Sequence, residues 1–206
     1  MKFPTIIPVY NKQATLRWAL YSTLDQVGVA HQDHQIIIID DGSSDAFLDL
    51  AKQFKLENRH RNIDLYVQEN GGVSSARNRG IALASHELVT FLDADDTYTP
   101  NFLSEISQTI DKFPTAHVWA TSYNFVSTSA GTKQGVNLSG LTESDYQLID
   151  DFFISAATGD PPITSSSVCI NKESLLAGWR ISTRAANGRV PICMVLACTT
   201  RPSCHL

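Results

Sequence analysis

The sequence predicts an α/β fold in which a mixed, mostly parallel sheet is flanked by helices within a single domain. In the amino-terminal half, short apolar runs alternate with segments of helical periodicity. This alternation is typical of parallel strands joined by right-handed helical crossovers. One run, at 36–39, consists of four consecutive isoleucines, as expected for a strand covered on both faces. The 206 residues suffice for one such core.

Four strand–helix pairs follow one another in the first half of the chain. We expect strands at 5–9, 35–39, 63–67 and 88–92, and helices at 13–26, 45–56, 73–84 and 101–112. Gly80 lies inside the third helix, where glycine costs about 1 kcal/mol, and this predicts close packing against the sheet. Beyond Trp119 the pattern weakens, and we expect a helix at 142–153, a strand at 164–170 and a short helix at 171–177.

Charge and composition exclude several classes of protein. The net charge is −5, so no basic surface neutralises nucleic-acid phosphates, and nucleic acid is not an expected partner. No apolar run reaches the roughly 18 residues that span a bilayer, and the start lacks the features of a signal peptide. We expect a cytoplasmic protein, with at most peripheral contact at the inner face of the cytoplasmic membrane. The four cysteines form neither a CxxC pair nor a zinc-like spacing with histidine.

An acidic cluster directly follows the apolar run at 88–92. Asp93, Asp95 and Asp96 bring three carboxylates to the end of a buried strand, where they repel one another unless a positive charge lies between them. A hard divalent cation, Mn²⁺ or Mg²⁺, takes oxygen ligands and often shares them with the phosphates of a substrate. The cluster therefore predicts a metal site, and a solvated acidic loop is the alternative that the residues alone leave open.

Polar loops follow all four of these strands, at 8–11, 40–44, 70–75 and 93–96. Ligands of parallel sheets bind beyond the carboxyl ends of the strands, so we expect the four loops to form a single site at one edge. Asp40 and Asp41 in the second loop suit hydrogen bonds from a ribose or a base. The same two residues also suit a turn and a helix cap, which is the structural alternative.

The third loop opens a helix with a glycine turn. Backbone N–H groups near Gly71 and Gly72, together with the helix dipole, favour an anion. Arg77, one turn further, is placed to reach a base or a phosphate, or to pair with one of the acids. The pattern is neither a GxGxxG fingerprint nor a phosphate-binding P-loop. The four loops together predict a nucleoside diphosphate bound with a divalent cation.

These motifs, in their order and spacing, resemble those of the family 2 glycosyltransferases. The resemblance is carried by Pro8-Val9-Tyr10-Asn11, Asp40-Asp41-Gly42-Ser43, Asn70-Gly71-Gly72 with Ala76-Arg77-Asn78, and Phe91-Leu92-Asp93-Ala94-Asp95-Asp96. It covers about residues 3–115 and is looser over 164–178. It implies a GT-A (Rossmann-like) fold and a nucleotide-diphospho-sugar donor, for which we expect a UDP-sugar. It also implies transfer with inversion to a glycan or lipid-linked acceptor, as in polysaccharide biosynthesis.

The resemblance also implies roles for individual residues. Asp93 and Asp95 match the family's DxD motif and would hold Mn²⁺ or Mg²⁺, with Asp95 on the metal and Asp93 toward the ribose or the metal. The residues expected to bind the nucleotide-sugar are Pro8, Tyr10, Asp40, Asp41, Arg77, Asp93 and Asp95. Those expected to support them are Asn11, Gly71, Gly72 and Asp96.

The carboxyl end departs from the family pattern, which places an acidic base after the helix that ends near Gly178. Residues 179–206 contain no Asp or Glu but four Arg, three Cys and His205, so no catalytic base is assigned. His205 is a poor candidate at the terminus, and nothing selects one acid among Glu143, Asp145, Asp150, Asp151 and Asp160. We therefore expect a GT-A domain over 1–178, with its donor-binding half at about 1–115, and an atypical tail over 179–206.

Two questions follow from this tail. We hypothesise that it is truncated or frameshifted from about 178–180 onward, and a divergent native tail is the alternative. A GT-A domain that binds nucleotide-sugar but lacks turnover, because the base loop is missing, is accordingly the second functional hypothesis. The third is an unrelated α/β nucleotide-binding protein whose loops match by chance.

Overall fold

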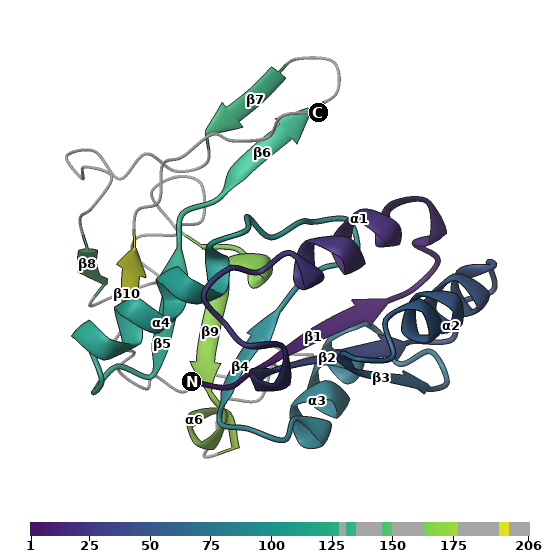
Figure 1. Ribbon diagram of the computed structural model, residues 1–206, viewed down its shortest axis with the longest axis horizontal. Coiled ribbons are helices and arrows are strands. Elements are labelled where there is room, and N and C mark those ends of the chain that lie inside the picture. The colour runs from purple at the N-terminus through teal and green to yellow at the C-terminus, as the bar shows by residue number, and fades with distance from the viewer. Residues whose placement is uncertain (128–130, 135–145, 150–162, 177–193, 198–206) are drawn as a thin grey trace.

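A central sheet of eight strands, in the order β3-β2-β1-β4-β9-β5-β10-β8, organises the chain (Figure 1). The structure is a computed structural model that describes residues 1–127, 131–134, 146–149, 163–176 and 194–197. The strands of this sheet are β1 (Phe3–Val9), β2 (His34–Asp40), β3 (Asn62–Val67), β4 (Leu88–Phe91), β5 (Val118–Thr121), β8 (Tyr146–Ile149), β9 (Val168–Asn171) and β10 (Met194–Ala197). A separate hairpin pairs β6 (Asn124–Ser127) with β7 (Gly131–Gln134).

The sheet is mixed and mostly parallel, as the sequence predicts. β1 pairs in parallel with β2 and β4, and β2 pairs in parallel with β3, so the arrows of β1, β2 and β3 point the same way in Figure 1. β9 runs antiparallel between β4 and β5, while β10 pairs in parallel with β5 and antiparallel with β8. The chain leaves β1 toward β2 and β3 on one side and returns to β4 on the other. The switch point of the sheet, where open α/β sheets bind ligands, therefore lies between β1 and β4.

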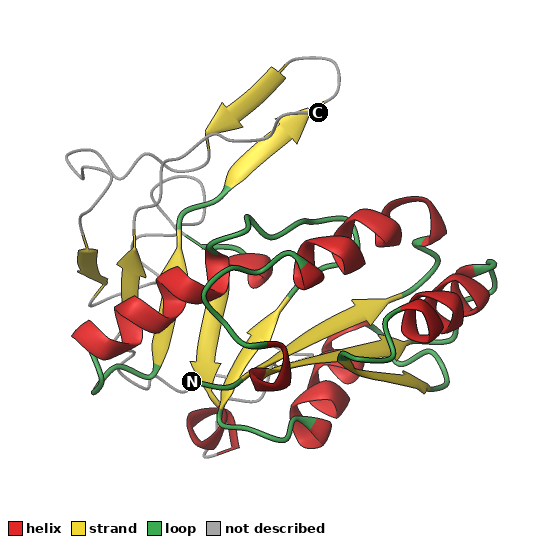
Figure 2. Cartoon of the chain, in the orientation of Figure 1, coloured by secondary structure: helices red, strands yellow, loops and turns green. Residues whose placement is uncertain are grey.

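Helices cover both faces of the sheet (Figure 2). One buried cluster joins the sheet to α1 (Gln13–Leu24), α2 (Phe47–Glu57) and α4 (Phe102–Lys112), and a second joins it to α3 (Val73–Leu83) and α6 (Lys172–Leu176). Within β2, Ile36 and Ile38 belong to the first cluster, whereas Ile37 and Ile39 belong to the second. The unbroken isoleucine run is thus explained, because a strand covered on both faces needs an apolar side chain at every position.

Gly80 confirms the predicted close approach of α3 to the sheet. A Cβ atom at this position would overlap the side chain of Ile6, which is fully buried in β1. Any larger residue would push α3 away from the strand that leads into the first loop. The glycine thus fixes the distance between α3 and the switch point.

The structure corrects one predicted element and refines another. The helix expected at 142–153 is wrong in its described part, because Tyr146–Ile149 forms strand β8, which pairs with β10. Pairing with a distant strand outweighs local helical propensity here. The strand expected at 164–170 is shorter, because a 3₁₀ turn, η2 (Ser165–Ser167), precedes β9. β10 itself lies in the tail, where we predicted no element.

Several predicted features lie outside the described residues. They are Glu143, Asp145, Asp150, Asp151, Asp160, Gly178 and His205. Cys169 is buried in β9 as a free thiol, and its burial raises the pKa of that thiol. Within the described part of the chain, no helix has both the length and the apolar character needed to cross a bilayer.

Candidate functional site

The loop after β1 is joined to the loop after β2 through Asn11. Its backbone has φ of 51°, a left-handed conformation that asparagine tolerates better than most residues. Its side-chain oxygen accepts hydrogen bonds from the backbone N–H of Ser44 at 2.8 Å and of Asp45 at 3.3 Å. Its own N–H donates to the hydroxyl of Ser43 at 3.0 Å. The conformation of Asn11 therefore fixes one loop against the other.

Asp40, the last residue of β2, and Asp41, directly after it, are both buried. Oδ1 of Asp40 accepts a hydrogen bond from the backbone N–H of Ser43 at 2.9 Å, which is the turn-forming role named above as the structural alternative. Among the described residues no partner is found for its other oxygen. Both oxygens of Asp41, in contrast, are bound within the chain. The two carboxylates therefore differ in how many of their oxygens are hydrogen-bonded within the chain, although the sequence does not distinguish them.

Asp41 connects the loop after β2 to the start of α3. Its Oδ1 accepts from the backbone N–H of Gly71 at 2.9 Å and from Nε2 of Gln68 at 2.6 Å. Its Oδ2 accepts from the backbone N–H of Gly72 at 2.8 Å. Gly72 adopts φ of 84°, a conformation that favours glycine. The N–H groups of Gly71 and Gly72 thus bind the chain's own carboxylate, and the expected binding of a phosphate at this helix start stays a prediction.

The loop after β4 carries the acidic cluster, and two of its carboxylates each contact a cation. Arg77 Nη2 of α3 lies 2.5 Å from Oδ1 of Asp93, and Lys12 Nζ lies 2.5 Å from Oδ2 of Asp95. The first pair is the more buried, since its side chains are 15% and 30% exposed, against 43% and 48% for the second. The sequence offered Arg77 as a partner of the acids, whereas Lys12 was not predicted.

Two serines of η2 hold the same acidic loop from the opposite side. The Ser165 hydroxyl donates to Oδ2 of Asp93, and the Ser166 hydroxyl donates to Oδ2 of Asp96, both at 2.6 Å. Ser166 also accepts from the backbone N–H of Asp93 at 3.0 Å. The sequence does not predict these contacts, although three consecutive serines inside the strand expected at 164–170 were the available signal.

Desolvation of the Asp96 carboxyl raises its pKa above the usual range. The Ser166 hydrogen bond opposes this rise in the pKa, the neighbouring Asp93 and Asp95 charges add to it, and Lys12 again opposes it. Three carboxylates within four positions thus interact through their charges. Part of that charge is compensated by Lys12 and Arg77.

Carboxylate oxygens are the ligands that Mg²⁺ and Mn²⁺ prefer, so the chemistry of Asp93, Asp95 and Asp96 fits a divalent cation. The residues that the structure describes contain no group of three or more His, Cys, Asp or Glu side chains arranged to hold a metal. Two of the three carboxylates are turned to Lys12 and Arg77 instead. A cation bound at Oδ2 of Asp95 would therefore have to replace the Lys12 ammonium there.

The remaining predicted residues lie along the first loop. Pro8 is buried within β1 opposite Ile39 of β2, and Tyr10, directly after the strand, is 51% exposed. An exposed tyrosine ring next to the switch point offers a surface on which a planar base can stack.

The contacts connect the four loops in a ring, a detail that goes beyond the predicted meeting of these loops at one edge. Asn11 joins the first loop to the second, Asp41 joins the second to the third, Arg77 joins α3 to the fourth, and Lys12 joins the fourth back to the first. The ring surrounds the carboxyl ends of β1, β2, β3 and β4. It confirms the prediction that these loops meet at one edge of the sheet.

The chain belongs to glycosyl transferase family 2, whose family model matches residues 5–162. It is 34% identical over 125 residues to the glycosyltransferase GlyA of Streptococcus pneumoniae, a match that covers 60% of this chain and 17% of GlyA. It is 35% identical over 123 residues to the succinoglycan biosynthesis protein ExoW of Rhizobium meliloti, which covers 58% of this chain and 37% of ExoW. The matches thus span less than two fifths of either relative.

Solved structures share the fold. Staphylococcus aureus TarS in complex with UDP-GlcNAc has a TM-score of 0.70 at 19% identity, over 98% of this chain and 60% of TarS. The mannosyltransferase PcManGT of Pyrobaculum calidifontis, in complex with GDP-Man and Mn²⁺, has a TM-score of 0.63 at 14% identity, over 85% of this chain and 46% of PcManGT. The likeness establishes the fold, and the expected GT-A class is confirmed.

Proposed function

We propose that this chain forms the donor site of a glycosyltransferase that uses a nucleotide-diphospho-sugar, with a UDP-sugar as the donor. The observation that carries the proposal is the position of the acidic cluster. Asp93 and Asp95 lie at the switch point between β1 and β4, held by cations from α3 and from the first loop. Family membership and the TarS structure with UDP-GlcNAc support the same donor class.

Asp93 and Asp95 are the residues that we assign to a divalent cation, Mn²⁺ or Mg²⁺. When bound, such a cation supplies positive charge that stabilises the negative charge of a leaving diphosphate. PcManGT, which shares the fold, was solved with Mn²⁺. Asp96, tied to Ser166, would support the loop that carries both ligands.

The nucleoside would lie along the first two loops. Asp40 is the better acceptor for a ribose hydroxyl or a base N–H, because one of its oxygens has no partner among the described residues. Asp41 instead fixes Gly71 and Gly72, so it would act through the shape of the loop. Tyr10 offers its exposed ring to the base, and Arg77, close to Asp93, would contribute positive charge near the nucleotide.

For the acceptor we propose a chemical class and not a particular molecule. We propose transfer with inversion to a glycan or a lipid-linked acceptor, in line with the biosynthetic role in the name of ExoW. Inversion needs one base that removes the proton of the acceptor hydroxyl during a single displacement. The acids that the sequence leaves open as that base lie outside the described residues; they are Glu143, Asp145, Asp150, Asp151 and Asp160.

A thermal-shift series tests the donor assignment. The chain is melted with UDP, GDP or dTDP, each with and without Mn²⁺, because a ligand that binds only the folded state raises stability by mass action. At a nucleotide concentration about 100-fold above Kd, the melting temperature should rise by about 5–10 °C. We expect this rise with UDP and Mn²⁺ together. No rise with any nucleotide would contradict the proposal.

A further inference from the structure

Lys12 holds a position that the family motifs do not assign. It is the residue before α1, and its ammonium crosses from the end of β1 to Asp95 in the loop after β4. The two residues are 83 positions apart in the chain, so the contact is set by the fold and not by local sequence. It spans the switch point, where the diphosphate would lie.

The Lys12–Asp95 pair is well suited to exchange. Its two side chains are 43% and 48% exposed, and ion pairs this open contribute little to stability. The Arg77–Asp93 pair, at 15% and 30% exposure, is more strongly confined. Lys12 is therefore easier to displace from the acidic cluster than Arg77.

We propose that Lys12 is an exchangeable internal cation of the donor site. It neutralises Asp95 in the donor-free protein and turns onto the diphosphate when a divalent cation takes Asp95. The inference rests on the proposed donor function and adds a residue and an exchange to it.

The charge and the flexible side chain of Lys12 suit it both to contact Asp95 and to contact a diphosphate. An ammonium and a divalent cation repel each other at contact distance, so they cannot share one oxygen of Asp95. The lysine side chain is a point charge on a flexible stem, and phosphate is a common partner of lysine. The first N–H group of α1, at Gln13, donates to Oδ2 of Asp45 at 3.0 Å, so that helix end already has an anionic partner. The contact to a diphosphate is therefore assigned to the Lys12 ammonium alone.

The first test measures Mn²⁺ binding without nucleotide, by the electron paramagnetic resonance signal of free Mn²⁺. Lys12→Met keeps the length of the side chain and removes its charge. We expect the variant to bind Mn²⁺ about three- to tenfold more tightly, because a competing ion pair and a nearby repulsion are both lost. Lys12→Arg should stay close to the wild type.

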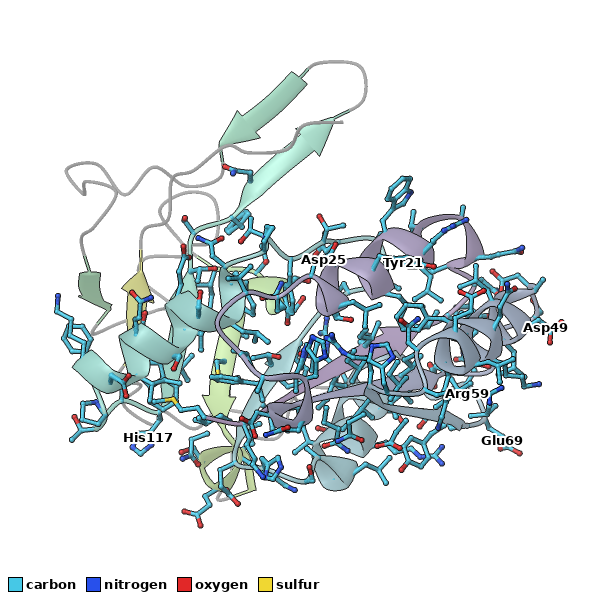
Figure 3. All side chains as sticks on the ribbon, viewed as in Figure 1. Tyr21, Asp25, Asp49, Arg59, Glu69 and His117 are labelled. Atoms are coloured by element: carbon cyan, nitrogen blue, oxygen red, sulfur yellow. The ribbon has the colours of Figure 1, made fainter. Side chains whose placement is uncertain are left out.

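The matched control is Lys52→Met. Lys52 forms an exposed pair with Asp49, at 4.0 Å on α2, and Asp49 projects outward from that helix at the edge of the molecule (Figure 3). This control removes the same charge from the chain at a distance from the site. Its Mn²⁺ affinity should equal that of the wild type.

The second test measures UDP binding by isothermal titration at saturating Mn²⁺. The expected effect on UDP affinity is opposite to that on Mn²⁺ affinity. Lys12→Met should bind UDP about tenfold more weakly, because a charge-assisted contact to the diphosphate is lost. Lys52→Met should bind UDP like the wild type.

The proposal requires that Lys12→Met bind Mn²⁺ more tightly and UDP more weakly than the wild type. Equal Mn²⁺ affinities of Lys12→Met and the wild type would show that Lys12 does not compete for Asp95. Unchanged UDP affinity would show that Lys12 does not reach the diphosphate, and either result overturns the proposal. If the wild type binds UDP and Mn²⁺ but Lys12→Met matches it, the donor site stands without the exchange. If the wild type binds neither, the donor function fails and the exchange fails with it.

Discussion

The carboxylate of Asp41 accepts a hydrogen bond from the backbone N–H of Gly72 at 2.8 Å, at the amino terminus of α3. The adjacent N–H of Gly71 donates to the other oxygen at 2.9 Å. An internal anion thus occupies the helix terminus that would otherwise attract a phosphate. Asp41 therefore holds the loop before α3 against the end of β2.

Asp41→Asn should therefore destabilise the protein. The neutral amide cannot accept from all three donors that contact the carboxylate, and its NH₂ group faces other N–H donors. We expect the free energy of unfolding, measured in urea, to fall by about 2–4 kcal/mol. The control is Asp49→Asn on the exposed side of α2, which should change it by less than about 0.5 kcal/mol. Equal effects of the two variants would show that Asp41 is not a structural anion.

Arg77 and Lys12 should differ in their contribution to stability, although both contact the acidic cluster. Arg77→Met leaves the half-buried Asp93 carboxylate without its cation, and we expect a loss of about 1–3 kcal/mol in unfolding free energy. Lys12→Met removes an exposed pair and should cost less than about 1 kcal/mol. Urea denaturation of both variants makes the comparison, and a reversed order would refute the burial argument.

His34 should make the protein less stable in acid. Burial, followed by the nearby positive charge of Arg61, lowers the pKa of His34 from 6.5 to about 4. Below pH 6.5 the unfolded chain binds a proton that the folded protein does not, so stability is complete above pH 6.5 and is lost as the pH falls toward 4. The loss should reach about 3 kcal/mol. His34→Gln, compared with the wild type at pH 7 and pH 4, should lack this component of the pH dependence, and identical slopes would contradict it.

Ser166 should control the titration of Asp96. Desolvation raises the pKa of Asp96 above its ordinary value of 3.8, and the Ser166 hydroxyl partly offsets that rise. Ser166→Ala should therefore raise the Asp96 pKa further, as followed by ¹³C NMR of the carboxyl groups in metal-free protein. Ser165→Ala removes a hydrogen bond to Asp93 instead and serves as the control. A larger effect of the control would mean that the two serines are assigned to the wrong acids.

Local patterns in the sequence predict the donor half of the fold well. The isoleucine run at 36–39 identifies a strand covered on both faces. Gly80 predicts the close approach of α3 to the sheet, and polar loops after four strands predict their meeting at one edge. Each of these features is a property of neighbouring residues. The period of apolar positions and the rules of parallel sheets then suffice to place them.

Local sequence patterns do not predict contacts between residues that lie far apart in the chain. Lys12 meets Asp95 across 83 positions and Ser166 meets Asp96 across 70, and no spacing in the sequence indicates either pair. The local pattern at 142–153 predicts a helix where Tyr146–Ile149 forms a strand, because the partner strand β10 lies far away in the tail. The choice between Asp40 and Asp41 as acceptor also depends on which N–H groups fold against each one.

The most direct measurement is the equilibrium titration of UDP, over a range of Mn²⁺ concentrations, into the wild type, Asp95→Ala and the surface control Asp49→Ala. We predict Mn²⁺-dependent UDP binding by the wild type and the control, and a loss of at least about tenfold in UDP affinity for Asp95→Ala. Asp95→Ala binding UDP with unchanged affinity and unchanged Mn²⁺ dependence would contradict the assignment of the donor site to the switch point.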